Sequence, residues 1–73
     1  MSEYAVVIEK GATSYGAYVP DLPGCVAAAE TAEEVEQLIR EAIEFHIEGL
    51  RLDAHPVPPP TTRLTYVAVS AAG

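Results

Sequence analysis

The chain has 73 residues, of which 49% are hydrophobic, and its 11 acidic and 4 basic side chains give a formal net charge of −7. This length allows one small domain, which buries only about 60% of the surface that its unfolded chain exposes. The negative charge disfavours direct binding of nucleic acid or of an anionic membrane, because both require a basic surface. Cys25 is the only cysteine, so a disulfide within the chain is excluded and self-association is the expected way to complete a thin core.

Three strands are predicted in the first part of the chain. Residues 4–10 are rich in β-branched and aromatic side chains, and residues 15–19 resume this pattern after a four-residue turn. So short a connection predicts an antiparallel hairpin. Residues 20–24 end the second strand, because two prolines lack backbone donors and Gly24 permits a positive φ. The third predicted strand covers residues 25–29.

A long amphipathic helix is predicted to follow from Thr31, with an apolar stripe that reaches Leu50. Thr31 and Glu34 have the spacing of a capping box, in which the threonine hydroxyl accepts the backbone amide of the glutamate and the glutamate carboxylate reaches back. Apolar side chains then recur at helical spacing on one face, and glutamates occupy the other. The apolar face comprises Val35, Leu38, Ile39, Ala42, Ile43, His46 and Leu50. We therefore expect one helix that lies on a sheet and presents an acidic outer face to solvent.

The rest of the chain predicts a final strand. Four prolines within residues 56–60 end the helix and form a stiff connector, and residues 63–69 have strand composition. A right-handed crossover would return this strand parallel to the first. The predicted fold is therefore α+β, with the order β-β-β-α-β, a mixed and mainly antiparallel four-stranded sheet, and one long helix on one face. The open face would carry some of the four tyrosines, which suit a protein interface: Tyr4, Tyr15, Tyr18 and Tyr66.

The residues that could carry chemistry do not form a recognisable catalytic set. We interpret His46 as a core histidine bonded to a backbone carbonyl, because no nucleophile lies at a suitable spacing. Cys25 is interpreted as a small buried apolar side chain, since an activated thiol needs a nearby base or a helix N-terminus. A nuclease would need carboxylates that converge from adjacent strands, and residues 63–69 contain none. No enzyme activity, cofactor or metal site is predicted; a pocket near His46 or Cys25 is the alternative.

Several segments together resemble the HicB family of antitoxins. They are Tyr18-Val19-Pro20-Asp21-Leu22-Pro23-Gly24-Cys25, Glu30-Thr31-Ala32-Glu33-Glu34-Val35 and Arg40-Glu41-Ala42-Ile43. These segments are similar to the family's Pro-Asp-Leu-Pro-Gly-Cys turn, its Thr-x-x-Glu helix start and its Glu-Ala-Ile stretch, and the resemblance spans about residues 4–69. It implies a partial ribonuclease H-like fold without catalysis. It also implies an antitoxin that binds a small, basic, RNA-cleaving toxin of the HicA type and blocks its active site.

The resemblance also implies roles for individual residues. Tyr18, Asp21 and Glu30 are expected to face the partner, although the pair Ala29-Glu30 departs from the small polar residues common in the family. Structural roles in the turn and the helix start are expected for Pro20, Asp21, Pro23, Gly24, Thr31 and Glu34. Many family members carry a C-terminal DNA-binding domain, whereas here we expect a single domain over residues 1–73 without one.

The function predicted from the sequence is a non-catalytic antitoxin module for a small basic toxin. The alternative is an orphan homo-oligomer of the same fold, with a structural or regulatory role and no toxin partner. Homo-oligomerisation is expected in either case, and direct binding of nucleic acid or membrane is not. The N-terminus lacks the basic region and long apolar core of a signal peptide, and the lone cysteine suits a reducing compartment, so a cytoplasmic location is expected.

Overall fold

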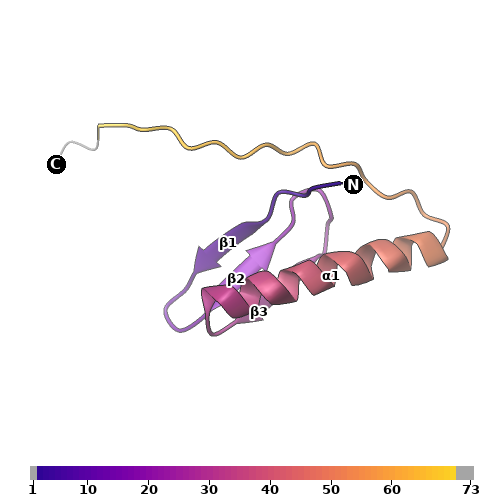
Figure 1. Ribbon diagram of the computed structural model, residues 1–73, viewed down its shortest axis with the longest axis horizontal. Helices are drawn as coiled ribbons and strands as arrows, with labels where there is room; N and C mark the ends of the chain where they lie inside the picture. The colour runs from indigo at the N-terminus through magenta and orange to yellow at the C-terminus, as the bar shows by residue number, and fades with distance from the viewer. Residues whose placement is uncertain (1, 71–73) are drawn as a thin grey trace.

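Three short strands form an antiparallel sheet in the computed structural model, which describes residues 2–70. Their order is β1 (Val7–Lys10), β2 (Tyr15–Tyr18) and β3 (Val26–Ala29), so β1 and β3 are the edges (Figure 1). The predicted hairpin and third strand are thereby confirmed. Ile8 pairs with Ala17, and Ala17 pairs with Ala27. Because side chains alternate between the faces of a strand, these three residues share one face of the sheet.

A single long helix, α1 (Ala32–Leu52), lies across this face (Figure 1). Its start is the predicted capping box: the Thr31 hydroxyl accepts the Glu34 amide at 3.1 Å and donates to the Glu34 carboxylate at 3.3 Å. The helix ends at Leu52, shortly before the prolines predicted to end it, and Asp53 is its C-cap. It packs most closely over β3 and β2 and only marginally over β1.

The core is the small layer of apolar side chains between the helix and the sheet. Its buried members are Ala17, Val19, Leu22, Cys25, Val35 and Ile39. Cys25 is a free thiol within this cluster, as predicted. Leu22 is the one member that comes from a loop rather than from a regular element or its flank, and its side chain is fully buried.

The proline-rich turn between β2 and β3 brings Leu22 into the core. The Leu22 amide donates to the carbonyl of Val19 at 3.1 Å, and the Cys25 amide donates to the carbonyl of Leu22 at 3.0 Å. The Val19 amide closes the turn by donating to the carbonyl of Cys25 at 3.2 Å. Gly24 completes the bend with a φ of 85°, which confirms the prediction of a positive φ. The motif therefore has a definite structural role, which is to fold Leu22 back under the helix.

Replacing Gly24 by alanine should lower the free energy of unfolding by about 1–2 kcal/mol, the ordinary cost of a left-handed backbone for a residue with a Cβ. Space is not the cause, because a Cβ built at Gly24 meets no heavy atom within 4 Å. Urea unfolding of the two proteins measures the difference. Gly16→Ala is the matched control for the open space, since a Cβ there also meets nothing within 4 Å but its backbone is an ordinary strand. Equal losses in the two variants would contradict this account.

The predicted final strand is not formed, so the four-stranded sheet is wrong for the described chain. Residues 63–69 are extended and exposed, and within residues 2–70 the sheet contains only β1, β2 and β3. Tyr66 is 96% exposed. In Figure 1 this segment, coloured orange to yellow, runs past the N-terminus and away from the helix without joining the sheet. The partial ribonuclease H-like arrangement, which needs this strand beside β1, is accordingly not confirmed within residues 2–70.

The route of the connector explains why the strand is missing. The Tyr4 hydroxyl donates to the carbonyl of Pro58 at 2.5 Å, and the Asp21 carboxylate binds Thr61 and Thr62. These contacts tie the chain to the start of the first strand and to the turn after β2. The prolines between them restrict the backbone to extended conformations, so the chain cannot fold back sharply. Strand propensity alone did not reveal this constraint.

Candidate protein-binding surfaces

The face of the sheet opposite the helix carries one apolar row. Val7 pairs with Tyr18, and Tyr18 pairs with Val26, so these three side chains line up across the three strands. Tyr18 and Val26 are exposed. Some of the four tyrosines were expected on this face, and the register places Tyr18 there. It is the sequence-predicted partner-binding residue with the most exposed apolar surface around it.

The other tyrosines lie elsewhere. Tyr4 and Tyr15 are half-buried and pack against the core on the helix side of the sheet. Tyr66 is on the unpaired C-terminal segment. Glu30 is exposed between β3 and the helix, so a partner can reach it, but it lies at the opposite end of the strands from Asp21. The three residues predicted to face a partner are therefore not gathered at one point.

Asp21 has a partner inside the chain. Its Oδ2 atom accepts the backbone amides of Thr61 and Thr62 at 3.0 and 2.9 Å, and its Oδ1 atom accepts their hydroxyls at 3.1 and 2.8 Å. Four hydrogen bonds saturate one carboxylate and fix the point at which the C-terminal segment leaves the domain. Sequence reasoning missed Thr61 and Thr62. The available signal was a pair of adjacent hydroxyl residues directly after the prolines.

Protonation of Asp21 should release this contact at acid pH. The amide and hydroxyl of Thr62, helped by those of Thr61, hold the pKa of the Asp21 carboxyl below its ordinary value of 3.8. A lowered folded-state pKa contributes stability that is present above the unfolded pKa and is lost as the pH falls through the folded value. The amide proton shifts of Thr61 and Thr62 in NMR spectra should therefore titrate with a midpoint below 3.8. In Asp21→Asn this transition should vanish, and a midpoint at or above 3.8 would contradict the contact.

The residues considered for chemistry are not assembled into a reactive site. Burial raises the pKa of the Cys25 thiol, which opposes formation of the nucleophilic thiolate. His46 is half-buried, and within residues 2–70 its imidazole makes no hydrogen bond, so the expected bond to a carbonyl is not formed. Across the same residues, no three His, Cys, Asp or Glu side chains are placed to hold a metal ion.

The outer side of the helix carries an apolar row that sequence reasoning missed. Leu38, Phe45 and Leu52 are all exposed, and Phe45 is 81% exposed. Their spacing of seven residues keeps them on one side of the helix, with a drift of only about 20° at each step. Leu38 was predicted to face the sheet and instead belongs to this row. Phe45 and Leu52 flank a hollow of about 190 Å³ at Gly49.

A row of glutamates runs beside the apolar row. Glu34, Glu41 and Glu48 are exposed and each precedes a member of the apolar row by four residues, which places the two side chains on adjacent turns. Six of the 11 acidic residues lie in the helix. We call Leu38, Phe45 and Leu52, together with these three glutamates, the helix stripe. It combines apolar area with negative charge, which suits a partner whose surface is apolar and basic.

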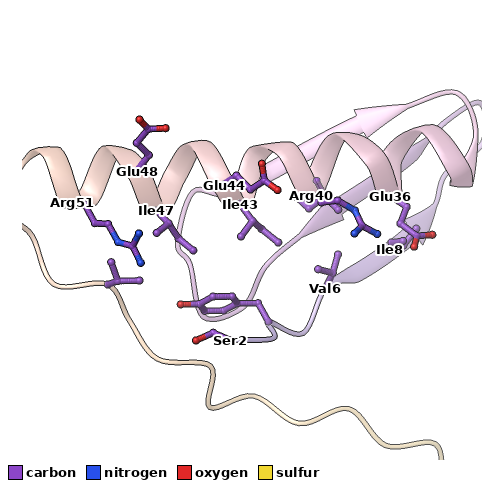
Figure 2. Close-up of a pocket in the computed structure, with 13 residues that line it drawn as sticks. Ser2, Val6, Ile8, Glu36, Arg40, Ile43, Glu44, Ile47, Glu48 and Arg51 are labelled. Carbon is purple, nitrogen blue, oxygen red and sulfur yellow. The ribbon is translucent and has the colours of Figure 1, made fainter.

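A groove of about 1190 Å³ separates β1 from the helix. Its apolar lining comes from β1 and the residues that precede it, from the adjacent side of α1 and from the connector: Tyr4, Val6, Ile8, Ile39, Ile43, Ile47 and Val57. Figure 2 shows Ile43 and Ile47 pointing from the helix towards the first strand, where Val6 and Ile8 lie, with Arg40 and Arg51 on the same side of the helix. The groove lies beside β1, which is an edge strand of the sheet, and Ile8 is the residue of β1 that lines it.

Among residues 2–70, no helix has the length and apolar character needed to cross a membrane.

The two strongest candidate surfaces, the helix stripe and the groove, both include side chains of α1, at different angles around the helix axis. One helix therefore serves the core, the groove and an exposed stripe.

Comparison with known proteins gives one family. The family model described as "HicB_like antitoxin of bacterial toxin-antitoxin system" matches residues 4–71. The chain is 44% identical over 55 residues to an uncharacterized 14.9 kDa protein from the rep-hol intergenic region of Haemophilus phage HP1, which covers 75% of the chain but 41% of the phage protein. It is 45% identical over 56 residues to a UPF0150 protein of Synechocystis sp., covering 75% of the chain and 71% of that protein.

A UPF0150 protein of Helicobacter pylori is 45% identical over 47 residues, which is 64% of the chain and 65% of that protein. The chain thus spans about two fifths of the phage protein and about two thirds of the two bacterial relatives. The family match covers the turn that buries Leu22, the capping box and the C-terminal segment. This chain therefore belongs to the family of HicB-like antitoxins of bacterial toxin–antitoxin systems.

Proposed function

We propose that this chain neutralises a small, basic, RNA-cleaving toxin of the HicA type by binding it, without catalysing a reaction itself. Membership of an antitoxin family supports a toxin as the partner. The observation that carries the proposal is the helix stripe, an exposed apolar row bordered by carboxylates on a chain of net charge −7. Such a surface attracts a basic protein at long range and offers it apolar area at contact.

The helix stripe is a better docking surface for such a toxin than the open face of the sheet. The sheet face offers Val7, Tyr18 and Val26 with Glu9 as its strand carboxylate. The stripe offers three large exposed apolar side chains and three carboxylates, on a continuous helix that is formed before binding. A preformed helical surface loses little conformational entropy on association. A convex helix can also enter the concave active site of an enzyme, which suits inhibition by occlusion.

The absence of an activity of its own is part of the proposal. Buried Cys25 and the scattered carboxylates of residues 2–70 support it, since nucleophilic or metal-assisted chemistry needs groups that converge. No cofactor is required for binding. The charge of −7 supports recognition of a basic protein in preference to nucleic acid, and an RNA-cleaving target supports a cytoplasmic site of action.

The proposal is tested with the product of a short basic reading frame adjacent to the gene for this chain. Each protein is purified separately, and cleavage of a labelled RNA by the basic protein is followed with increasing amounts of the chain. We expect cleavage to stop at a fixed stoichiometry and the two proteins to co-elute in gel filtration. Cleavage that continues unchanged at a tenfold excess of the chain would refute the proposal.

A second candidate is a homo-oligomer with a structural or regulatory role. The specific observation in its favour is the exposed strand-like segment at residues 63–69, which has no place in its own sheet. The two candidates are compatible, because self-association through that segment would leave the apolar row of the helix stripe free, although Glu48 also lines the groove. A tagged pull-down from the source cells separates them: recovery of a small basic protein supports the first candidate, and recovery of the chain alone supports the second.

A further inference from the structure

We propose that residues 63–69 of one copy pair with the free edge of β1 in a second copy and fill its groove, so that two copies exchange their C-terminal strands. The fourth strand that the sequence predicts would then form between chains. This inference concerns the protein alone and holds whether or not the chain neutralises a toxin.

The first observation is the state of the segment itself. Leu64, Tyr66, Val67 and Val69 are all exposed, and residues 63–69 form no ladder with any strand of residues 2–70. The apolar side chains stand on both faces of the segment, because they occupy both even and odd positions. A β-prone segment with exposed apolar side chains and unpaired backbone groups is a strong pairing element. Its composition is typical of an inner strand of a sheet, but the segment is exposed to solvent and unpaired.

The second observation is the groove beside β1, which can accommodate this segment. β1 is an edge strand, and the groove lies beside it, between the start of the chain and the helix. Ile8 of β1 and the preceding Val6 line it on one side, Ile43 and Ile47 line it from the helix (Figure 2), and Val57 of the connector lies at its border. A strand added beside β1 would direct alternate side chains into this space and the others onto the open face next to Val7. Seven extended residues span about 23 Å, which matches the length of the first strand with its flanks.

The third observation selects a second copy as the donor. Asp21 and Tyr4 hold Thr61, Thr62 and Pro58 in place, and the prolines between residues 56 and 60 keep the connector extended. Beyond Thr62 the segment separates from its own domain, and in Figure 1 it runs past the sheet at a distance without pairing with it. A stiff connector of this kind favours pairing of residues 63–69 with the sheet of a second copy over pairing with the sheet of the same chain. In two copies related by a two-fold axis, each segment fills the groove of the other copy, so the result is a closed dimer and not an open filament.

The test uses two double variants of the full chain. Tyr66→Asp/Val67→Asp places a carboxylate on each face of the segment, so its effect does not depend on the pairing register. Both side chains are exposed in the single chain, so the monomer fold does not require them. Phe45→Asp/Leu52→Asp is the matched control, with two equally exposed apolar residues of the helix stripe changed in the same way. Sedimentation equilibrium of the protein alone measures the dimer dissociation constant.

We expect the unaltered chain and the helix variant to be dimers, and the segment variant to dissociate about a hundredfold more readily, because in either register one carboxylate would replace an apolar side chain in the groove. An unaltered chain that is monomeric would overturn the proposal. So would a segment variant that dimerises normally, or a helix variant that alone dissociates. No toxin is present in the experiment, so its outcome is separate from that of the RNA cleavage assay.

A second measurement distinguishes exchange from pairing within one chain. Isotope-labelled and unlabelled copies are mixed, refolded together and examined by isotope-filtered NOE spectroscopy. We expect contacts between the methyl groups of Leu64, Val67 or Val69 on one copy and those of Ile43 or Ile47 on the other. If these contacts occur only within a copy, or are absent while the dimer persists, strand exchange is refuted.

Discussion

Replacement of Leu22 by alanine should destabilise the domain more than any other single truncation in its loops. The side chain is 0% exposed and lies in the cluster of six buried residues between the sheet and the helix. Truncation of a fully buried leucine costs about 2–5 kcal/mol, from the lost transfer free energy and from the cavity that remains. A domain of 73 residues is stable by only about 4–11 kcal/mol. The variant is therefore expected to be partly unfolded at physiological temperature.

Thermal and urea unfolding at one fixed protein concentration measure this loss, because self-association would make the midpoint depend on concentration. For a domain of this size, each kcal/mol lowers the melting temperature by about 4–8 °C. Leu52→Ala is the matched control, since it removes the same atoms from a residue that is 79% exposed. Its effect should remain within about 0.5 kcal/mol. Similar losses in the two variants would show that the turn does not anchor the core.

Replacement of Phe45 by aspartate should weaken toxin binding by about thirtyfold or more and leave the fold intact. Phe45 is the most exposed member of the apolar row and lies at its centre, between Leu38 and Leu52. A central aromatic side chain in an interface commonly contributes about 2 kcal/mol or more. The substitution also places a carboxylate in the contact. Surface plasmon resonance with the basic toxin measures the change, which should be mainly in the dissociation rate.

Ala12→Asp is the control for added charge, since Ala12 is exposed in the turn between β1 and β2. It should bind the toxin as the unaltered chain does. Glu41→Lys/Glu48→Lys tests the other half of the helix stripe: it should lower the association rate, and more strongly at low salt, because steering by exposed charges is screened. Unchanged binding by Phe45→Asp would move the docking surface away from the helix stripe. An unchanged association rate at low salt would show that these glutamates do not steer the toxin towards the helix stripe.

The elements that follow local rules could be predicted from the sequence. The hairpin, the capping box of Thr31 and Glu34, the bend at Gly24 and the burial of Cys25 all depend on residues close in the chain or on simple periodicity. The family resemblance also rests on such local motifs, and the matching model covers residues 4–71. These patterns did not indicate which apolar side chains of the helix pack against the sheet and which remain exposed.

The candidate sites were harder to predict, because they depend on what remains uncovered. Leu38 and Phe45 have the same apolar character as Ile39 and Ile43, and composition does not separate them. The sheet is three strands wide and covers one arc of the helix, which leaves the row from Leu38 to Leu52 outside and the groove open beside β1. Exposure of this kind is a property of the assembled layers.

The sequence by itself determined the order of the three strands and the helix, the acidic face of the helix and the family, since each depends on residues close together in the chain. Only the tertiary structure decided that residues 63–69 lie outside the sheet and that Asp21 binds Thr61 and Thr62, 40 and 41 residues away. Strand propensity states that a segment can pair but does not identify its neighbour. The direction of a stiff connector and the hydrogen bonds at its end determine which edge it can reach, and these contacts exist only once the chain has folded.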